Sequence, residues 1–88
     1  MTLKIETAID GRDLSLRIIG RIQSQDVDEL RAHIQSLRGR VVLDLDDVTL
    51  VDVMGVRFFA ACEAQGIDLI HCSPYIREWM GRERRRNV

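Results

Sequence analysis

Four aspartates lie close together in the middle of the chain, at positions 44, 46, 47 and 52. Carboxylate oxygens are the ligands that hard cations such as Mg²⁺ prefer, so this spacing is compatible with a magnesium site. Aspartates are equally typical of turns and of helix N-caps. No glycine-rich phosphate loop accompanies them, although Mg²⁺ is usually bound together with substrate phosphates. The sequence therefore favours structural roles for the four aspartates and predicts no metal site.

A second group of reactive residues consists of His71, Cys72 and Ser73, and Asp52 could lie near it. A catalytic triad needs a nucleophile, a base and an orienting acid within hydrogen-bond reach. Ser73, however, directly precedes a proline and is better explained as a helix N-cap, and Cys72 as a core residue at a strand end. Neither His71 nor His33 belongs to a metal-ligand spacing. We therefore predict no catalytic residue and no cofactor.

The C-terminal residues are basic, because five arginines and two glutamates from Arg77 onward give +3 in a chain of net charge −1. Such a run is able to contact nucleic acid or anionic lipid. It contains no interleaved aromatic residue, and the chain has no second basic patch, so a solvated tail is favoured over either partner. We expect one domain over residues 1–81 and a basic tail over 82–88.

The 88 residues suit a single small domain with one modest core. No apolar run approaches the roughly 20 residues that span a bilayer, and the N-terminus does not resemble a secretory signal. Cys62 and Cys72 form neither a CxxC pair nor a disulfide framework. These features predict a cytoplasmic protein with reduced thiols.

Periodicity predicts seven elements that would position these residues. Alternating apolar residues or short β-branched runs indicate strands, and apolar residues three or four positions apart indicate helices. The predicted strands cover residues 1–9, 13–19, 41–45 and 67–72, and a hairpin turn is expected at Asp10-Gly11. The first predicted helix carries Val27, Leu30, Ile34 and Leu37 on one face, the second covers 53–64, and the third contains Ile76, Trp79 and Met80. The first helix should be capped by Ser24 or Asp26 and end at Gly39, and the second should be capped by Asp52 and end before Gly66. The third should have Ser73 as its N-cap and Pro74 as its first residue.

This ββαβαβα order predicts a small mixed α/β sheet. The first two strands should form an antiparallel hairpin. The helical connections should make the second, third and fourth strands parallel, with right-handed crossovers. The carboxyl ends of the parallel strands then share one edge of the sheet, where function tends to gather in such folds. Residues 20–23, 46–54 and 71–75 should meet there.

Three stretches at this edge and in the central strand resemble the STAS domain, the fold of anti-sigma factor antagonists and of the cytoplasmic tails of sulfate transporters. Ile19-Gly20-Arg21-Ile22 resembles the glycine segment before the first STAS helix, and Val41-Val42-Leu43-Asp44-Leu45 resembles the central strand. Residues 48–55 resemble the loop that ends in Asp-Ser-Ser/Thr-Gly in that family. The likeness runs from about Leu3 to Met80, and it implies a bacterial signalling protein that regulates transcription through a protein partner.

The signature of this chain is Asp52-Val53-Met54-Gly55. By the resemblance, Met54 occupies the position of the serine or threonine that a partner kinase phosphorylates in the switching members. Phosphorylation adds negative charge and strong acceptor oxygens, and a thioether accepts no phosphate. No phosphorylation site is therefore expected at this position.

The helix predicted over 53–64 is apolar on two arcs. Val56, Phe59 and Ala60 share one arc, which should face the sheet. Met54, Phe58 and Cys62 point elsewhere, and they need either a neighbouring helix of the same domain or a partner. Both interpretations remain open at this point, and burial of the second arc in a homodimer is a further alternative.

We interpret the chain as a non-enzymatic protein-interaction module whose partner is an anti-sigma factor, a kinase-like protein or another signalling protein. Asp52 would fix the loop, Met54 would provide apolar contact, and Arg57 would lie at the rim. A small-molecule or lipid-sensing module, with a pocket between the strand ends and Tyr75 or Trp79, is the main alternative. The predicted partner-binding residues are Thr49, Val51, Asp52, Val53, Met54, Val56 and Arg57.

Overall fold

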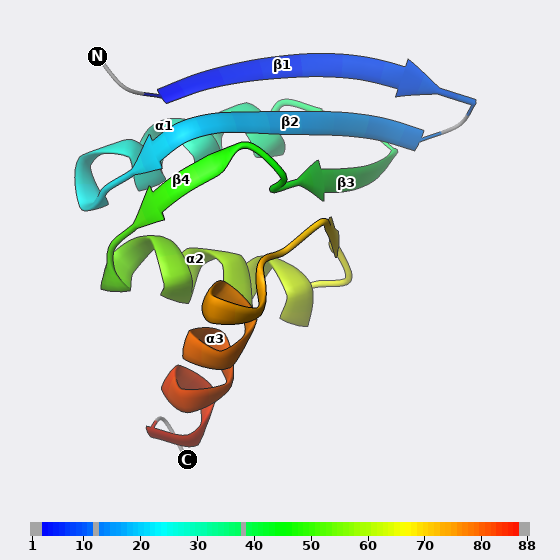
Figure 1. Cartoon of the computed structure of the whole chain (residues 1–88). Coiled ribbons are helices and arrows are strands. Elements are labelled where there is room, and N and C mark those ends of the chain that lie inside the picture. Colours follow the sequence, from blue (N-terminus) through cyan, green and yellow to red (C-terminus); the bar gives the residue numbers. More distant parts are fainter. Residues whose placement is uncertain (1–2, 12, 38, 87–88) are drawn as a thin grey trace.

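The computed structural model describes residues 3–11, 13–37 and 39–86 as one mixed sheet with three helices (Figure 1). The order is ββαββαβα. The elements are β1 (Leu3–Asp10), β2 (Asp13–Ile22), α1 (Ser24–Gln35), β3 (Arg40–Asp44), β4 (Val48–Val51), α2 (Val53–Ala64), β5 (Asp68–Ile70) and α3 (Pro74–Arg86).

Strand β2 organises the sheet. It pairs with β1 in antiparallel register and with both β3 and β4 in parallel register, and β5 is parallel to β3. The predicted antiparallel hairpin and parallel strands are therefore confirmed. The hairpin turn is shifted by one residue from the prediction, because Asp10 pairs with Asp13. Gly11, with φ 64°, lies in this turn, while residue 12 and the predicted strand start at residues 1 and 2 fall outside the described part of the chain.

Strand β4 is an element that the sequence did not predict. It pairs with the last residues of β2, from Gly20 to Ile22, which lie beyond the predicted end of that strand at Ile19. Gly20 has φ 102°, and the β2–β4 register shifts between Gly20 and Arg21. Glycine adopts this backbone conformation without the steric cost that a side chain would bring, so β2 continues through an irregularity instead of ending there.

The helix ends agree with the sequence to different degrees. Helix α2 has the predicted bounds and the predicted N-cap, Asp52. Helix α1 begins after Gln23, so neither Ser24 nor Asp26 is its N-cap; the carboxylate of Asp26 accepts the backbone N–H of Gln23 at 2.9 Å. At α3, the backbone N–H of Ile76 donates to Ser73 Oγ at 3.3 Å, as expected for a cap.

Helix α3 also corrects the prediction of a solvated tail. It continues without a break past Gly81 to Arg86. Glu83 is only 5% exposed, and its carboxylate accepts a hydrogen bond from Arg57 Nε at 2.8 Å. Residues 82–86 thus continue α3, and the buried Glu83 ties the last turns of this helix to α2.

The core lies between the sheet and the helices. Phe59 and Val56 of α2 are fully buried, as are Leu16 and Ile18 of β2 and Leu43 of β3. Helices α1 and α2 are neighbours, since the guanidinium of Arg31 lies 5.8 Å from the centre of the Phe58 ring. The remaining buried apolar residues are Leu3, Ile22, Val27, Leu30, Val41, Leu45, Val51, Phe58, Cys62, Ile76 and Met80.

Candidate functional site

The side chain of Asp52 joins the starts of two helices. Its Oδ1 accepts the backbone N–H of Gly55 in the first turn of α2 at 3.0 Å, and its Oδ2 accepts the N–H of Ser24 in the first turn of α1 at 2.8 Å. Both donors belong to the N–H groups that a helix start leaves without an intrahelical partner. A negative charge is also favourable at a helix N-terminus. One carboxylate therefore positions the turn between β4 and α2 relative to α1.

Gly55 allows α2 to start close to the sheet. A Cβ atom at this position would lie 2.5 Å from Val51 Cγ2 and 3.2 Å from Ile22 Cγ2. The first distance is far shorter than an ordinary carbon–carbon contact, so a larger residue would push the helix start away from β4. The start of α2 is thus positioned by the hydrogen bond from the Gly55 N–H to Asp52 and by the close approach of Gly55 to Val51 and Ile22.

The helix start presents apolar side chains to solvent. Met54 is 44% exposed and Val53 is 37% exposed. Thr49 and Arg57 are also exposed, and Asp52 is half-buried. These five residues are the predicted partner-binding residues that lie at the surface, and α2 with the adjoining β4 brings them together. We call Thr49, Asp52, Val53, Met54 and Arg57 the α2-start surface.

Two of the predicted contact residues do not belong to this surface. Val51 is 3% exposed and Val56 is 0% exposed, because both point into the core. This corrects the expectation that they contact a partner directly; they support the surface from beneath. Leu50 of β4, which is 49% exposed, was missed because β4 was read as a loop. No strand alternation indicates it, because Thr49 and Leu50 are consecutive exposed residues.

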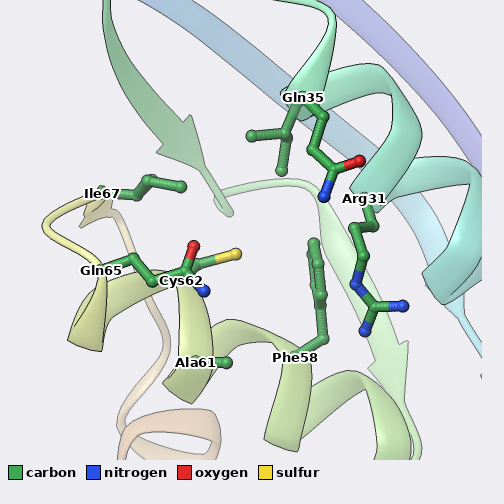
Figure 2. A pocket seen from close by; sticks show the side chains of 8 residues that line it. Arg31, Gln35, Phe58, Ala61, Cys62, Gln65 and Ile67 are labelled. Atoms are coloured by element: carbon green, nitrogen blue, oxygen red, sulfur yellow. The ribbon is translucent and has the colours of Figure 1, made fainter.

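Phe58 and Cys62, on the second arc of α2, are covered by α1 and not by a partner. Figure 2 shows both side chains directed toward a crevice whose other wall carries Arg31 and Gln35 of α1. The crevice measures about 240 Å³, which is smaller than the roughly 300–1,000 Å³ of pockets for drug-sized ligands. Burial raises the pKa of the Cys62 thiol to about 11, so this thiol is a weak nucleophile near neutral pH.

The pocket of the alternative hypothesis was expected elsewhere, at the strand ends beside Tyr75 or Trp79. Those two rings pack against each other in a tilted arrangement, with their centres 5.8 Å apart. The described crevice does not include either ring. Its lining residues are Arg31, Ile34, Gln35, Phe58, Ala61, Cys62, Gln65 and Ile67.

The other aspartates of the central stretch serve separate structural contacts. Asp47 pairs with Arg17, and Asp44 Oδ1 lies 3.0 Å from Nδ1 of His71 and accepts the N–H of Asp46 at 3.0 Å. Within residues 3–11, 13–37 and 39–86, no three His, Cys, Asp or Glu side chains are grouped to hold a metal ion. His71 thus pairs with Asp44, whereas the carboxylate of Asp52, the acid of the triad alternative, accepts the N–H groups of Gly55 and Ser24.

The ion pair of Asp44 and His71 shifts both pKa values. The hydrogen bond to Asp44, followed by its negative charge, raises the pKa of His71 above its ordinary value. For Asp44, burial is the largest effect and acts to raise the pKa, but the hydrogen bonds from His71 and from the N–H of Asp46 together outweigh it, so the pKa is lowered. The pair is fully charged only at pH values between these two pKa values.

Within the described residues, no helix combines the length and apolar character that crossing a membrane requires. No protein-family model and no curated protein matches the sequence significantly. Solved structures, in contrast, match the fold. The phosphorylated form of the Bacillus cell fate determinant SpoIIAA superposes with a TM-score of 0.63 at 17% identity, covering 92% of this chain and 82% of that one.

The fold is STAS-like. The unphosphorylated form of the anti-sigma factor antagonist SpoIIAA gives a TM-score of 0.62 at 18% identity, over 86% of this chain and 78% of that one. An antisigma-factor antagonist STAS domain from Rhodobacter sphaeroides gives 0.59 at 17% identity, over 77% of this chain and 83% of that one. The STAS-like fold predicted from the sequence is therefore confirmed, with β4 as the added strand.

Proposed function

We propose that this chain is a non-enzymatic interaction module that binds a regulatory protein, of the anti-sigma factor or kinase-like class, through the α2-start surface. The observation that carries the proposal is the exposure of Met54 and Val53 at a helix end that is held in place by Asp52 and Gly55. Methionine suits adaptable apolar contacts because its side chain is unbranched and polarisable. A partner that covers these two side chains would gain apolar burial without ordering a flexible loop.

The chemistry of residue 54 also suggests how binding is controlled. If Met54 occupies the position that is phosphorylated in the switching STAS proteins, the partner meets an uncharged thioether there in every state of the protein. Binding would then be constitutive, or controlled by a different part of the pathway. The rim of the surface is also fixed, since Arg57 is held by the buried carboxylate of Glu83 at 2.8 Å.

The test is a titration with a candidate anti-sigma factor or kinase-like protein from the same genome. Met54→Asp should weaken binding by about tenfold or more, because a charge in the centre of an apolar contact costs more than 1 kcal/mol. Tyr75→Asp is the matched control, since Tyr75 is an exposed apolar side chain on another helix. Equal affinity of wild type and Met54→Asp would refute the proposed surface.

A second variant tests separately whether the residue at position 54 determines phosphorylation. Met54→Ser restores a hydroxyl on the first turn of α2, where an exposed side chain is accessible to a kinase. If the partner has kinase activity, it should phosphorylate this variant and leave wild type unmodified at α2, and the phosphorylated variant should bind it more weakly. Phosphorylation of wild type within residues 48–57 would contradict the constitutive mode.

A further inference from the structure

The outer side of β1 is an unprotected sheet edge. Strand β1 pairs with β2 along its whole length, from Leu3 with Gly20 to Asp10 with Asp13, and among the described residues no strand pairs with its other side. Such an edge presents a row of backbone N–H and C=O groups that are free to pair with another chain. Proteins usually protect long edges with a proline, a bulge or several lysines, but β1 has no proline, no register shift and one lysine.

The apolar face of β1 is also incompletely covered. Side chains at odd positions point to the same face as the core residue Leu3. Coverage decreases along this row: Leu3 is buried, Ile5 is half-buried, Thr7 is exposed, and Ile9 is 78% exposed. Ile9 is thus the most exposed of the large apolar side chains in the described chain, and it lies at the hairpin end of β1, far along the sheet from the α2 start (Figure 1).

We infer that β1 is a pairing surface for the β1 strand of a second copy of this chain. Two copies related by a two-fold axis through one residue of β1 would form an antiparallel pair and extend one sheet across both molecules. In this arrangement that central residue faces its own copy, and odd residues face odd residues, so the apolar faces stay on the same side. A two-fold axis between two residues would instead place odd residues of one strand opposite even residues of the other, so that apolar side chains would meet the polar face.

The side-chain types select the centre of the pair. An axis through Thr7 places Ile5 opposite Ile9 of the second copy in two symmetry-related pairs. It also places Lys4 opposite residue 10, an aspartate in the sequence, and Glu6 opposite Ala8. This pairing covers the exposed Ile9 and matches opposite charges, both of which stabilise cross-strand pairs.

The neighbouring centres are less favourable. An axis through Glu6 would place two glutamates directly opposite each other, which is destabilising. An axis through Ala8 would place Glu6 opposite the acidic residue 10. An axis through Ile5 keeps the charges matched, but Ile9 then has no opposing residue within the described strand, and the overlap of the described residues is shorter. The charge pattern and the exposed isoleucine therefore point to Thr7 as the centre.

Single cysteines identify the centre directly, because only the residue on the axis faces itself. Opposed Cα atoms of antiparallel strands lie about 4.5–5.5 Å apart, which suits a disulfide. In a Cys72→Ser background, we expect Thr7→Cys to form disulfide-linked dimers under mild oxidation about tenfold faster than Ala8→Cys or Glu6→Cys. The reason is that pairing gives millimolar effective concentrations of the opposed thiols, far above micromolar protein concentrations. Equal rates for the three variants, or fastest linkage at Glu6→Cys, would overturn this arrangement.

Light scattering tests the dimer without added thiols. The native chain should show a concentration-dependent dimer, and Ile9→Lys should raise its dissociation constant at least about tenfold by placing a charge against Ile5. Ile70→Lys is the matched control, because Ile70 is an exposed isoleucine on β5 at the other edge of the sheet. A native chain that remains monomeric up to millimolar concentration would refute the inference. The α2-start surface is not involved, so partner binding can succeed or fail independently.

Discussion

Replacement of Asp52 tests whether one carboxylate stabilises the starts of two helices. In Asp52→Ala, the N–H of Gly55 loses an acceptor at 3.0 Å and the N–H of Ser24 loses one at 2.8 Å. Loss of an N-cap side chain costs about 1 kcal/mol. The second bond is exposed to solvent, so we assign it about 1 kcal/mol, the value of an ordinary hydrogen bond and below the roughly 1.5–3 kcal/mol of bonds to charged groups. We expect the free energy of unfolding to fall by about 2 kcal/mol.

Asp52→Asn separates the two bonds. Its amide has a single oxygen, so it can cap α2 or accept from Ser24, but its NH₂ group cannot accept the remaining N–H. The expected loss is about 1 kcal/mol, half that of the alanine variant. For a domain of this size, 1 kcal/mol corresponds to about 4–8 °C in Tm, so thermal unfolding followed by circular dichroism resolves the two variants.

The control for these variants is Asp28→Ala, which removes a highly exposed carboxylate of α1 whose ion-pair partner among the described residues is Arg31. Its stability should stay within about 0.5 kcal/mol of wild type. If Asp52→Ala also stays within this margin, the carboxylate does not hold the two helices. If Asp52→Asn matches wild type, only one of the two bonds contributes.

Three further predictions concern other parts of the fold. Gly55→Ala should lower stability by about 1–2 kcal/mol in urea unfolding, because the close contact of the new Cβ outweighs the gain in helix propensity; a more stable variant would contradict this close packing. An NMR titration should give His71 a pKa above its ordinary value, and Asp44→Asn should remove this shift. The raised pKa of His71 contributes stability that is present below about pH 6.5 and is lost as the pH rises through the folded-state pKa. The lowered pKa of Asp44 contributes stability that is lost as the pH falls through its own folded-state pKa. Deletion of residues 82–88 should destabilise the domain by about 1–3 kcal/mol, because it removes the buried Glu83 and the last turns of α3; unchanged unfolding would restore the solvated-tail interpretation.

The sequence was most informative where local chemistry and periodicity agree. Helix α2 has an apolar repeat, an aspartate before its first residue and a glycine after its end, and its predicted bounds are those of the structure. Ser73 and Pro74 likewise marked the start of α3. These signals depend on neighbours within a few residues, so they can be read without knowledge of the tertiary structure.

The sequence was misleading where pairing partners decide the conformation. Gly20 resembles a strand breaker, but β4 pairs with the residues that follow it and keeps β2 extended. Strand β4 itself has only four residues, and two consecutive ones are exposed, so its sequence lacks the alternation that indicates a half-buried strand. The basic end of α3 looked unstructured because the contact that orders it, between Glu83 and Arg57, joins residues 26 positions apart.

In the candidate site, too, some positions followed from nearby residues and others depended on contacts that are distant in the sequence. The position of Asp52 followed from helix-start chemistry and that of Gly55 from the resemblance of residues 48–55 to the STAS loop, and Met54 is exposed as the proposed surface requires. Val56 is buried, as expected for the arc of α2 that faces the sheet, and this is inconsistent with the predicted contact to a partner. Val51 lies on β4, and its burial depends on the pairing of β4 with β2 and on the close approach of Gly55, which the sequence does not reveal.

The most direct test of the central claim is an NMR footprint of the partner on the ¹⁵N-labelled chain. Upon addition of the anti-sigma or kinase-like partner, backbone amides of residues 49–57 and the methyl group of Met54 should shift or broaden. Amides of the β1–β2 turn and of β5 should remain unchanged. A footprint confined to those distant segments, with residues 49–57 unaffected, would contradict recognition through the start of α2.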